Sequence, residues 1–251
     1  MVWLSRIAAA GFILALPLLL ITTNVRFLAG EVRLYERGFR AYDSDTRTGL
    51  PLPELDRAAR EVIDYFENDA TTLRITVDDG GDEVALYNAR ETEHMKDVKW
   101  LMRVVFRVNE ISLAYVLSYV AGVFLWAGAG SLRRLAVYAL AGIGVGLVGV
   151  GFVLGAAALY GFDATWTRFH TIVFNNDFWR LNPATDRLIQ MFPEPFWQAE
   201  TYLVAAMTVV EVLVIVGAAV ACIMLSKDDA GPSADEPRPE RARARRIRAA
   251  D

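Results

Sequence analysis

Four long apolar runs constrain what this chain can fold into more than any other feature. They cover residues 7–25, 111–129, 135–160 and 202–225. A helix that rises about 1.5 Å per residue needs roughly 18 to 20 apolar residues to cross a hydrocarbon core of about 30 Å, and each run approaches or exceeds that length. The sequence therefore predicts a mainly α integral membrane protein, built as a bundle of four transmembrane helices.

The arginines indicate how the bundle is oriented. Arg133 and Arg134 occupy the short connection between the second and third runs, and Arg6 precedes the first. Further arginines follow the last run, at Arg238, Arg241, Arg243, Arg245, Arg246 and Arg248. The positive-inside rule places these segments and both termini in the cytoplasm. Residues 30–110 and 161–200 are then exoplasmic. The net charge of -4 arises in the loops and the tail, and we expect membrane lipids but no nucleic acid as partners.

The first run could instead be a cleaved signal peptide, because Arg6 precedes an apolar stretch that contains Pro17. No clear A-x-A site follows it, and its removal would leave an odd number of spans, in conflict with the arginine pattern unless the topology inverts. We therefore expect a retained helix. The expected parts are a first span (1–29), an exoplasmic insert (30–110), two spans with a short turn (111–160), a second exoplasmic segment (161–200), a last span (201–225) and a disordered tail (226–251).

The exoplasmic insert has the patterns of a small α+β unit. Apolar residues recur at helical spacing behind two prolines, which predicts an amphipathic helix that begins near Glu54. Residues 73–77 alternate between apolar and polar, residues 78–81 read Asp-Asp-Gly-Gly, and residues 84–87 are apolar again. This order is typical of a β-hairpin.

After the hairpin, Asn88 and Glu91 have the spacing of a capping box and can begin a helix toward the second span. This helix carries His94 and Asp97. Because they are three residues apart they share a helix face, so Asp97 could hold one imidazole nitrogen and leave the other free. The chain has one other histidine, His170, in the second exoplasmic segment. Alternatively, His94 is a solvated helix residue.

The second exoplasmic segment is dense in aromatic residues between positions 166 and 197. An interfacial aromatic belt explains the rings. It does not explain four polar residues that need partners if the segment packs at a membrane surface. These are Asn176, Asp177, Asn182 and Asp186.

Two motifs in the exoplasmic segments resemble a known family. Residues 169–197 read F-H-x(3)-F-x-N-D-x-W-x-L-N-P-x-T-D-x-L-I-x-M-F-P-E-x-F-W, and residues 93–99 read E-H-M-K-D-V-K. Both are similar to the four-span lipoprotein intramolecular transacylases, called Lit. The resemblance implies a bacterial plasma-membrane enzyme whose site lies at the exoplasmic face. Such an enzyme moves an acyl chain from the glyceryl sn-2 position of a diacylated lipoprotein to the α-amine of its N-terminal cysteine, which gives the lyso-form. It also implies that His94 and His170 form the catalytic dyad.

The chemistry of the residues is compatible with this activity. Ester-to-amine transfer needs a base, an oxyanion stabiliser and an acid, and imidazoles with a pKa of about 6.5 can supply these. No protein nucleophile or cofactor is needed, because both reacting groups belong to one substrate molecule. Cys222 is expected on the wrong side of the membrane, Ser44 is far from any motif, and Ser112 begins the second span. An acyl-enzyme is therefore disfavoured.

Two alternatives compete with the dyad. One is a metal-dependent hydrolase in which two histidines and two carboxylates bind the ion: His94, Asp97, His170 and Asp177. The other is a non-enzymatic membrane protein whose exoplasmic insert binds a ligand or a partner. The resemblance favours the dyad. Imidazoles within about 4 Å of each other, or bridged by one water, would support it, and a separation beyond about 10 Å would argue against it.

The spans contain unusual residues of their own. Glu211 lies well inside the fourth run, where a carboxyl group is costly and therefore a functional candidate. Tyr119 lies at a similar depth in the second run, which predicts a hydrogen bond between them. Such a pair could line a substrate cavity or simply lock two helices together. The third run has G-x-x-x-G pairs, which predict close helix packing, most plausibly within the chain, and leave the oligomeric state open. They comprise Gly142, Gly146, Gly151 and Gly155.

Overall fold

The computed structural model describes residues 2–126 and 130–228. Its elements are α1 (Val2–Gly30), α2 (Val32–Ala41), α3 (Ser44–Thr48), α4 (Leu52–Glu67), β1 (Thr76–Asp79), β2 (Asp82–Ala85), α5 (Ala89–Trp126), α6 (Gly130–Tyr160), α7 (Phe162–Val173), α8 (Arg187–Met191) and α9 (Glu194–Asp228). Four of these helices, α1, α5, α6 and α9, are long and apolar enough to cross a membrane. The predicted four-span, mainly α class with a small hairpin is therefore confirmed. The predicted disordered tail lies outside the described residues, apart from the last turn of α9.

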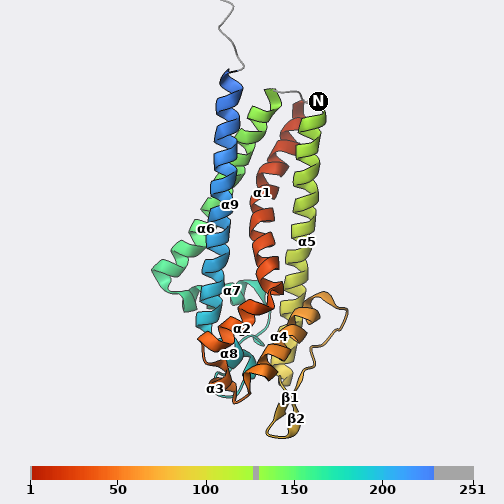
Figure 1. The fold of residues 1–251 in the computed structure, drawn as a ribbon, viewed down its shortest axis with the longest axis vertical. Helices are drawn as coiled ribbons and strands as arrows, with labels where there is room; N and C mark the ends of the chain where they lie inside the picture. The colour runs from red at the N-terminus through yellow and green to blue at the C-terminus, as the bar shows by residue number, and fades with distance from the viewer. Residues whose placement is uncertain (1, 127–129, 229–251) are drawn as a thin grey trace, which may run out of the picture.

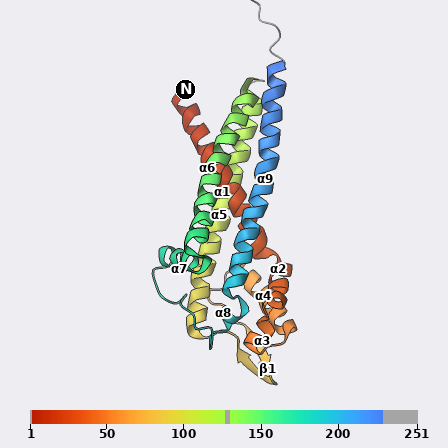
Figure 2. The same ribbon diagram turned by 90° about the vertical axis from the view of Figure 1, so that its left-hand side faces the viewer.

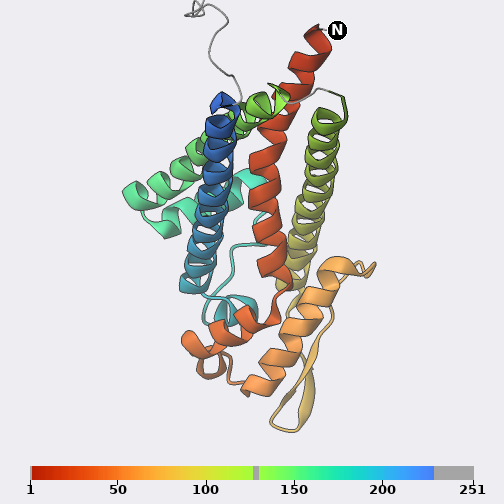
Figure 3. The same ribbon diagram turned by 45° about the horizontal axis from the view of Figure 1, so that its top comes forward.

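Helix α1 occupies the middle of the bundle, where it packs against α5, α6 and α9 (Figures 1 and 3). Its contact with α6 depends on glycine. A Cβ atom at Gly142 would lie 2.9 Å from the backbone oxygen of Ile13, and one at Gly146 would lie 2.8 Å from a proline side chain of α1. The predicted close packing within the chain is confirmed at these two positions. It is wrong for Gly151 and Gly155, where an added Cβ would meet nothing within 4 Å in the described chain.

The central place of α1 also decides the partner of the intramembrane carboxyl group. Asn24 of α1 is 1% exposed, and its amide donates hydrogen bonds to Thr208 Oγ1 at 3.0 Å and to Glu211 Oε2 at 3.1 Å, both on α9. Tyr119 instead stacks on Phe12 of α1 with ring centroids 4.7 Å apart. The predicted bond between Glu211 and Tyr119 is therefore wrong, because α1 supplies a different partner to each of them.

The insert packs at one end of the bundle as three helices and a hairpin (Figures 1 and 2). The predicted amphipathic helix is α4, which buries its apolar side, including Leu55 and Val62. These residues share one core with Phe39 of α2 and with Met191 and Phe192 of the second exoplasmic segment. Residues far apart in the chain therefore form a single extramembrane unit.

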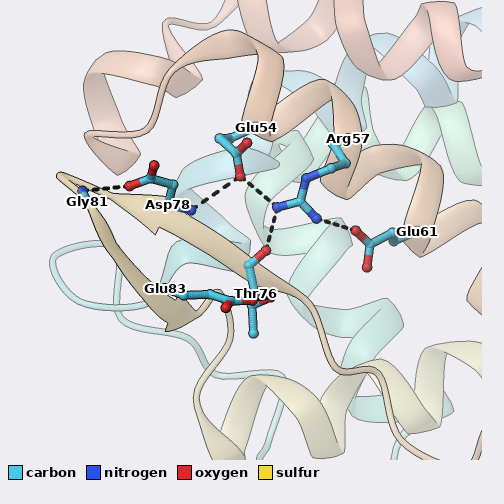
Figure 4. A network of polar contacts seen from close by, with 7 residues as sticks. All are labelled: Glu54, Arg57, Glu61, Thr76, Asp78, Gly81 and Glu83. Atoms are coloured by element: carbon cyan, nitrogen blue, oxygen red, sulfur yellow. Dashed lines mark hydrogen bonds and ion pairs between the residues drawn. The ribbon is translucent and has the colours of Figure 1, made fainter.

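The hairpin is held against α4 by a network of charged residues (Figure 4). The guanidinium of Arg57 donates hydrogen bonds to the carboxylates of Glu54 and Glu61 and to the backbone oxygen of Thr76 in β1. Glu54 also accepts a hydrogen bond from the backbone N–H of Asp78 at 3.4 Å. The outer edge of β1 is therefore satisfied by side chains of α4.

Helix α5 joins the insert to the bundle without a break. Its 38 residues extend about 57 Å, nearly twice the thickness of a hydrocarbon core. The first part, up to Glu110, carries several charged side chains, so the membrane-spanning part begins near Ile111. The predicted capping box begins the helix: the N–H of Asn88 donates to Glu91 Oε2 at 2.7 Å, and the N–H of Glu91 donates to Asn88 Oδ1 at 3.1 Å.

Candidate active site

The two histidines of the chain meet where the extramembrane part of α5 approaches α7. The ring centroids of His94 and His170 lie 6.0 Å apart, with the ring planes at 40°. The residues are only 7% and 8% exposed. The fold thus brings together the two side chains that the sequence singled out, well inside the separation of about 10 Å that would argue against a dyad.

The backbone of α7 fixes the orientation of the His170 ring. Its Nδ1 lies 2.8 Å from the carbonyl oxygen of Trp166, one turn earlier in the helix. A carbonyl oxygen can only accept, so Nδ1 carries the proton of the neutral ring. The lone pair is then on Nε2, which has no hydrogen-bond partner among the described residues. This nitrogen can accept a proton from a substrate.

Aromatic rings surround the pair. The ring centroid of His170 lies 4.8 Å from that of Trp166 and 5.0 Å from that of Trp179. Phe174 contacts both imidazoles, with centroid distances of 5.4 Å to His94 and 5.6 Å to His170. These rings belong to the second exoplasmic segment, whose high aromatic content was noted in the sequence. They line the site with apolar surface, which limits the access of water.

This apolar setting keeps both imidazoles neutral. Burial lowers the pKa of His94 to about 4, and the proximity of His170 adds to the effect. Burial also lowers the pKa of His170, although its hydrogen bond to the Trp166 carbonyl partly opposes this. Both residues lie outside the membrane-spanning segments, so neighbouring side chains, not lipid, exclude water from the two imidazoles. Near neutral pH each ring can therefore act as an acceptor and as a donor.

Asp97 does not contact His94, so the predicted orienting bond is wrong. Its Oδ2 accepts a hydrogen bond from the side-chain amide of Asn176 at 2.8 Å. The Nδ1 atom of His94 is buried and has no hydrogen-bond partner in the part of the chain that the structure describes. Asp97 shares a helix face with His94 as expected, but its carboxylate is hydrogen-bonded to Asn176 in the loop after α7 instead.

Asn176 connects this contact to His170. Its backbone oxygen accepts a hydrogen bond from Trp179 Nε1 at 2.9 Å, and its Oδ1 accepts one from the N–H of Phe178 at 3.1 Å. The ring of Trp179 in turn packs on His170. Asp97, Asn176 and Trp179 therefore form a connected series from the helix of one histidine to the ring of the other.

A second group of polar residues fixes the motif segment to the start of α5. Asp186 accepts hydrogen bonds from the Asn88 amide at 3.0 Å and from the N–H of Asn182 at 2.7 Å. Glu91 Oε1 accepts one from the N–H of Leu188 at 2.6 Å. Burial raises the pKa of Glu91. The sequence identified Glu91 only as a helix cap, because the second oxygen of a capping carboxylate gives no sign of a distant partner.

The remaining acidic candidates lie away from the histidines. Asp177 has a side chain that is 73% exposed and pairs with Arg180. Since Asp97 faces Asn176, the four residues proposed as metal ligands do not converge. No group of three or more possible His, Cys, Asp or Glu ligands exists among residues 2–126 and 130–228.

The candidate nucleophiles are also accounted for. The expectation that Ser44 is far from any motif is wrong: its hydroxyl is fully buried and donates to the carbonyl oxygen of Met191 at 2.9 Å, inside the motif segment. That hydroxyl therefore has a structural partner. Ser112 is buried in α5 and Cys222 lies near the end of α9, both in the bundle.

Comparison with known proteins identifies the family. The profile of the lipoprotein intramolecular transacylase family Lit matches residues 10–197. This chain belongs to the Lit family. The membrane-integral Lit of Bacillus cereus has a similar structure, with a TM-score of 0.65, 16% identity, and coverage of 90% of this chain and 96% of that chain. Among curated proteins no sequence matches.

Two further structures of Bacillus cereus Lit carry a substitution of one histidine, to arginine and to alanine. The arginine form matches with a TM-score of 0.61 and 17% identity, over 89% of this chain and 91% of that chain. The alanine form matches with a TM-score of 0.64 and 16% identity, over 89% and 92%. The protein is therefore an integral membrane enzyme of the Lit family, a lipoprotein intramolecular transacylase. The family match includes His94 and His170 but ends before Glu211.

Proposed function

We propose that this Lit-family enzyme transfers an acyl chain from the glyceryl sn-2 ester of a diacylated lipoprotein to the α-amine of its N-terminal cysteine, and that His94 and His170 act on the reacting atoms. The observation that carries the proposal is the placement of the two rings, 6.0 Å apart in a buried aromatic setting. Both rings are neutral there, and both belong to the segments with the family motifs.

In this reaction His170 is the base. Its Nε2 accepts a proton from the α-amine as the nitrogen attacks the ester carbon, and a C–N bond forms. The tetrahedral intermediate then collapses, the bond between the acyl carbon and the sn-2 oxygen breaks, and the proton passes from Nε2 to that oxygen. The products are an amide and a free glyceryl hydroxyl. Atoms and charge balance within one substrate molecule, so neither water nor a cofactor takes part.

His94 stabilises the oxyanion in this scheme. A neutral imidazole carries one N–H, and a buried polar atom without a partner costs about 1–3 kcal/mol. Nδ1 of His94 is such an atom. A hydrogen bond from the His94 ring to the developing oxyanion would use this donor capacity only when charge forms on the substrate.

The other candidate residues position the pair. Asp97 and Asn176 hold the two histidine-bearing segments together, and Asp186 with Asn182 shapes the motif loop. The site lies at the end of the bundle opposite Arg133 and Arg134, which supports an exoplasmic active site at a bacterial plasma membrane, with both termini in the cytoplasm. Residues 30–110 and 161–200 would together form the catalytic face.

The test uses purified enzyme in detergent and a synthetic diacylated lipopeptide, with mass spectrometry of the product. Replacing either histidine, as His94→Ala or His170→Ala, should lower formation of the lyso-form at least about 100-fold, the effect of losing a general acid–base group. Lys96→Ala, on the exposed side of the same helix, is the matched control. Activity should persist in a chelator. Unchanged activity in both histidine variants, with normal thermal unfolding, would refute the proposal.

A further inference from the structure

A cleft on the outer side of the hairpin lies across the start of α5 from the histidine pair. We infer that it binds the polypeptide chain of the substrate lipoprotein, a few residues after the lipidated cysteine. This inference rests on the proposed function, because it assigns the part of the same substrate that leaves the site. It concerns binding and adds no step to the reaction.

The cleft has a volume of about 480 Å³, in the range of small-ligand sites. The strand segments that flank it are paired, with Thr76 opposite Ala85. Side chains of opposite residues in an antiparallel pair lie on the same face of the sheet. One wall is thus the exposed face of the hairpin, and the other is the first turn of α5. The residues that line the two walls include Thr72, Arg74, Thr76, Ala85, Thr92 and Glu93.

One edge of the hairpin is open at this cleft. The N–H of Leu86 donates to the carbonyl oxygen of Ile75 at 2.8 Å. Bonded and non-bonded pairs alternate in an antiparallel ladder, so the backbone groups of Glu83 and Ala85 point away from β1. No backbone partner for either occurs among the described residues. The edge of β1 is closed by Arg57 and Glu54 (Figure 4), so an added strand can pair only with β2.

A free cation lies in the same cleft. Arg74 is exposed, and no hydrogen bond or ion pair of its guanidinium is present in the part of the chain that the structure describes. The nearby Arg57, in contrast, is bonded to two carboxylates. An unpaired guanidinium beside an open strand edge is suited to the carbonyl oxygens and acidic side chains of an extended peptide.

The position of the cleft fits this occupant. Three residues of the first turns of α5 line the cleft, Ala89, Thr92 and Glu93, and at about 100° per residue they lie on the side of the helix turned away from His94. The start of α5 therefore separates the cleft from the histidine pair. A helix is about 10 Å across, and an extended chain advances about 3.3–3.6 Å per residue. An extended chain that passes around the start of α5 covers about 16 Å, so about five residues would lead from the reacting cysteine to the cleft. The substrate of a lipoprotein transacylase has such a chain attached to the reacting residue.

The experiment compares two diacylated lipopeptides, one with a single residue after the cysteine and one with about ten, a length that reaches through the cleft. Arg74→Glu removes the cation, and Ala85→Pro removes the outward N–H from the open edge. Arg74→Glu should raise the KM for the long substrate about tenfold, the loss expected for one charge-assisted hydrogen bond, and Ala85→Pro should raise it about two- to tenfold, the loss expected for one neutral hydrogen bond. In both variants kcat should stay unchanged. Neither should alter the KM for the short substrate.

Arg33→Glu, an equal charge change on the exposed side of α2, is the control and should leave both KM values unchanged. Thermal unfolding checks that Ala85→Pro keeps the fold, and Arg74→Glu decides the question if it does not. Equal effects on the two substrates, or none on the long one, would overturn the inference. So would an Arg74→Glu effect that follows the anionic lipid content of vesicles instead of peptide length. Conversion of the short substrate by the unaltered enzyme tests the proposed function separately.

Discussion

The pH dependence of acyl transfer gives a quantitative test of the buried histidine pair. The perturbation is a change of pH from 6.5 to 5.5. An ordinary imidazole with a pKa of about 6.5 would fall from about one half neutral to about one tenth neutral, a loss of about fivefold. With a pKa of about 4, His94 stays about 97% neutral at pH 5.5. Burial also lowers the pKa of His170, so its ring loses the neutral form at lower pH than an ordinary imidazole does.

The substrate amine sets the remaining dependence. An α-amine titrates near 7.7–8.0, so its neutral fraction falls about tenfold for each pH unit below that. The rate constant kcat/KM should therefore fall at least about tenfold between pH 6.5 and 5.5, and by less than it would with an unshifted histidine. If an unshifted histidine also had to be neutral, the fall would be about fiftyfold. The sign follows from the direction of the shift: a lowered pKa keeps the basic form available as pH falls, and activity is lost only on approach to the lowered value.

The assay is the initial rate of lyso-form production from a synthetic lipopeptide, read by mass spectrometry at half-unit pH intervals. Thermal unfolding at each pH shows whether the enzyme remains folded. A slope of one in log kcat/KM down to about pH 5.5 agrees with buried, neutral rings. A break near pH 6.5 with a slope of two below it would refute the argument that the aromatic rings desolvate the histidines.

Three substitutions test the packing that supports the site, each by thermal unfolding in detergent. Glu91→Ala leaves the buried N–H of Leu188 without an acceptor and should cost about 1–3 kcal/mol; an unchanged Tm would contradict the assignment. Asn24→Leu should destabilise the bundle more than the double variant with Glu211→Leu, because only the single change strands a carboxyl group; additivity would count against their contact. Gly142→Val should separate α1 from α6, whereas Gly151→Val should not, and equal effects would disprove this packing.

The features that the sequence predicted correctly have local causes. A run of apolar residues, a capping box or an Asp-Asp-Gly-Gly turn acts through neighbours in the chain, so periodicity and spacing are sufficient to predict α4, the hairpin and the start of α5. The regular geometry of an α-helix likewise places His94 and Asp97, three residues apart, on one face. The spacing could not show which donor the carboxylate of Asp97 would bind. That donor is the side-chain amide of Asn176, from a segment far along the chain.

The same limit applies inside the membrane. Hydropathy shows that Glu211 is buried in a span, but every span has a polar residue at some depth, and hydropathy does not rank the neighbours of a helix. The partner is decided by the central position of α1, which places Asn24 against Thr208 and Glu211. The glycine spacing predicted close packing at four positions, and the structure has it at two of them, Gly142 and Gly146. The reason is similar, since a small residue permits close approach without requiring a neighbour.

The aromatic segment shows how one composition can suit two different environments. Rings at a membrane surface and rings around a buried catalytic site both remove water from their neighbours. A high density of aromatic residues therefore does not distinguish an interfacial belt from the lining of a site. Here Trp166, Phe174 and Trp179 surround the imidazoles. An acyl transfer to an amine competes with hydrolysis of the same ester, and water is the more abundant nucleophile. In the proposed reaction, the rings that lower the histidine pKa values would therefore also favour the amine over water, which links the electrostatics of the site to its choice of acceptor.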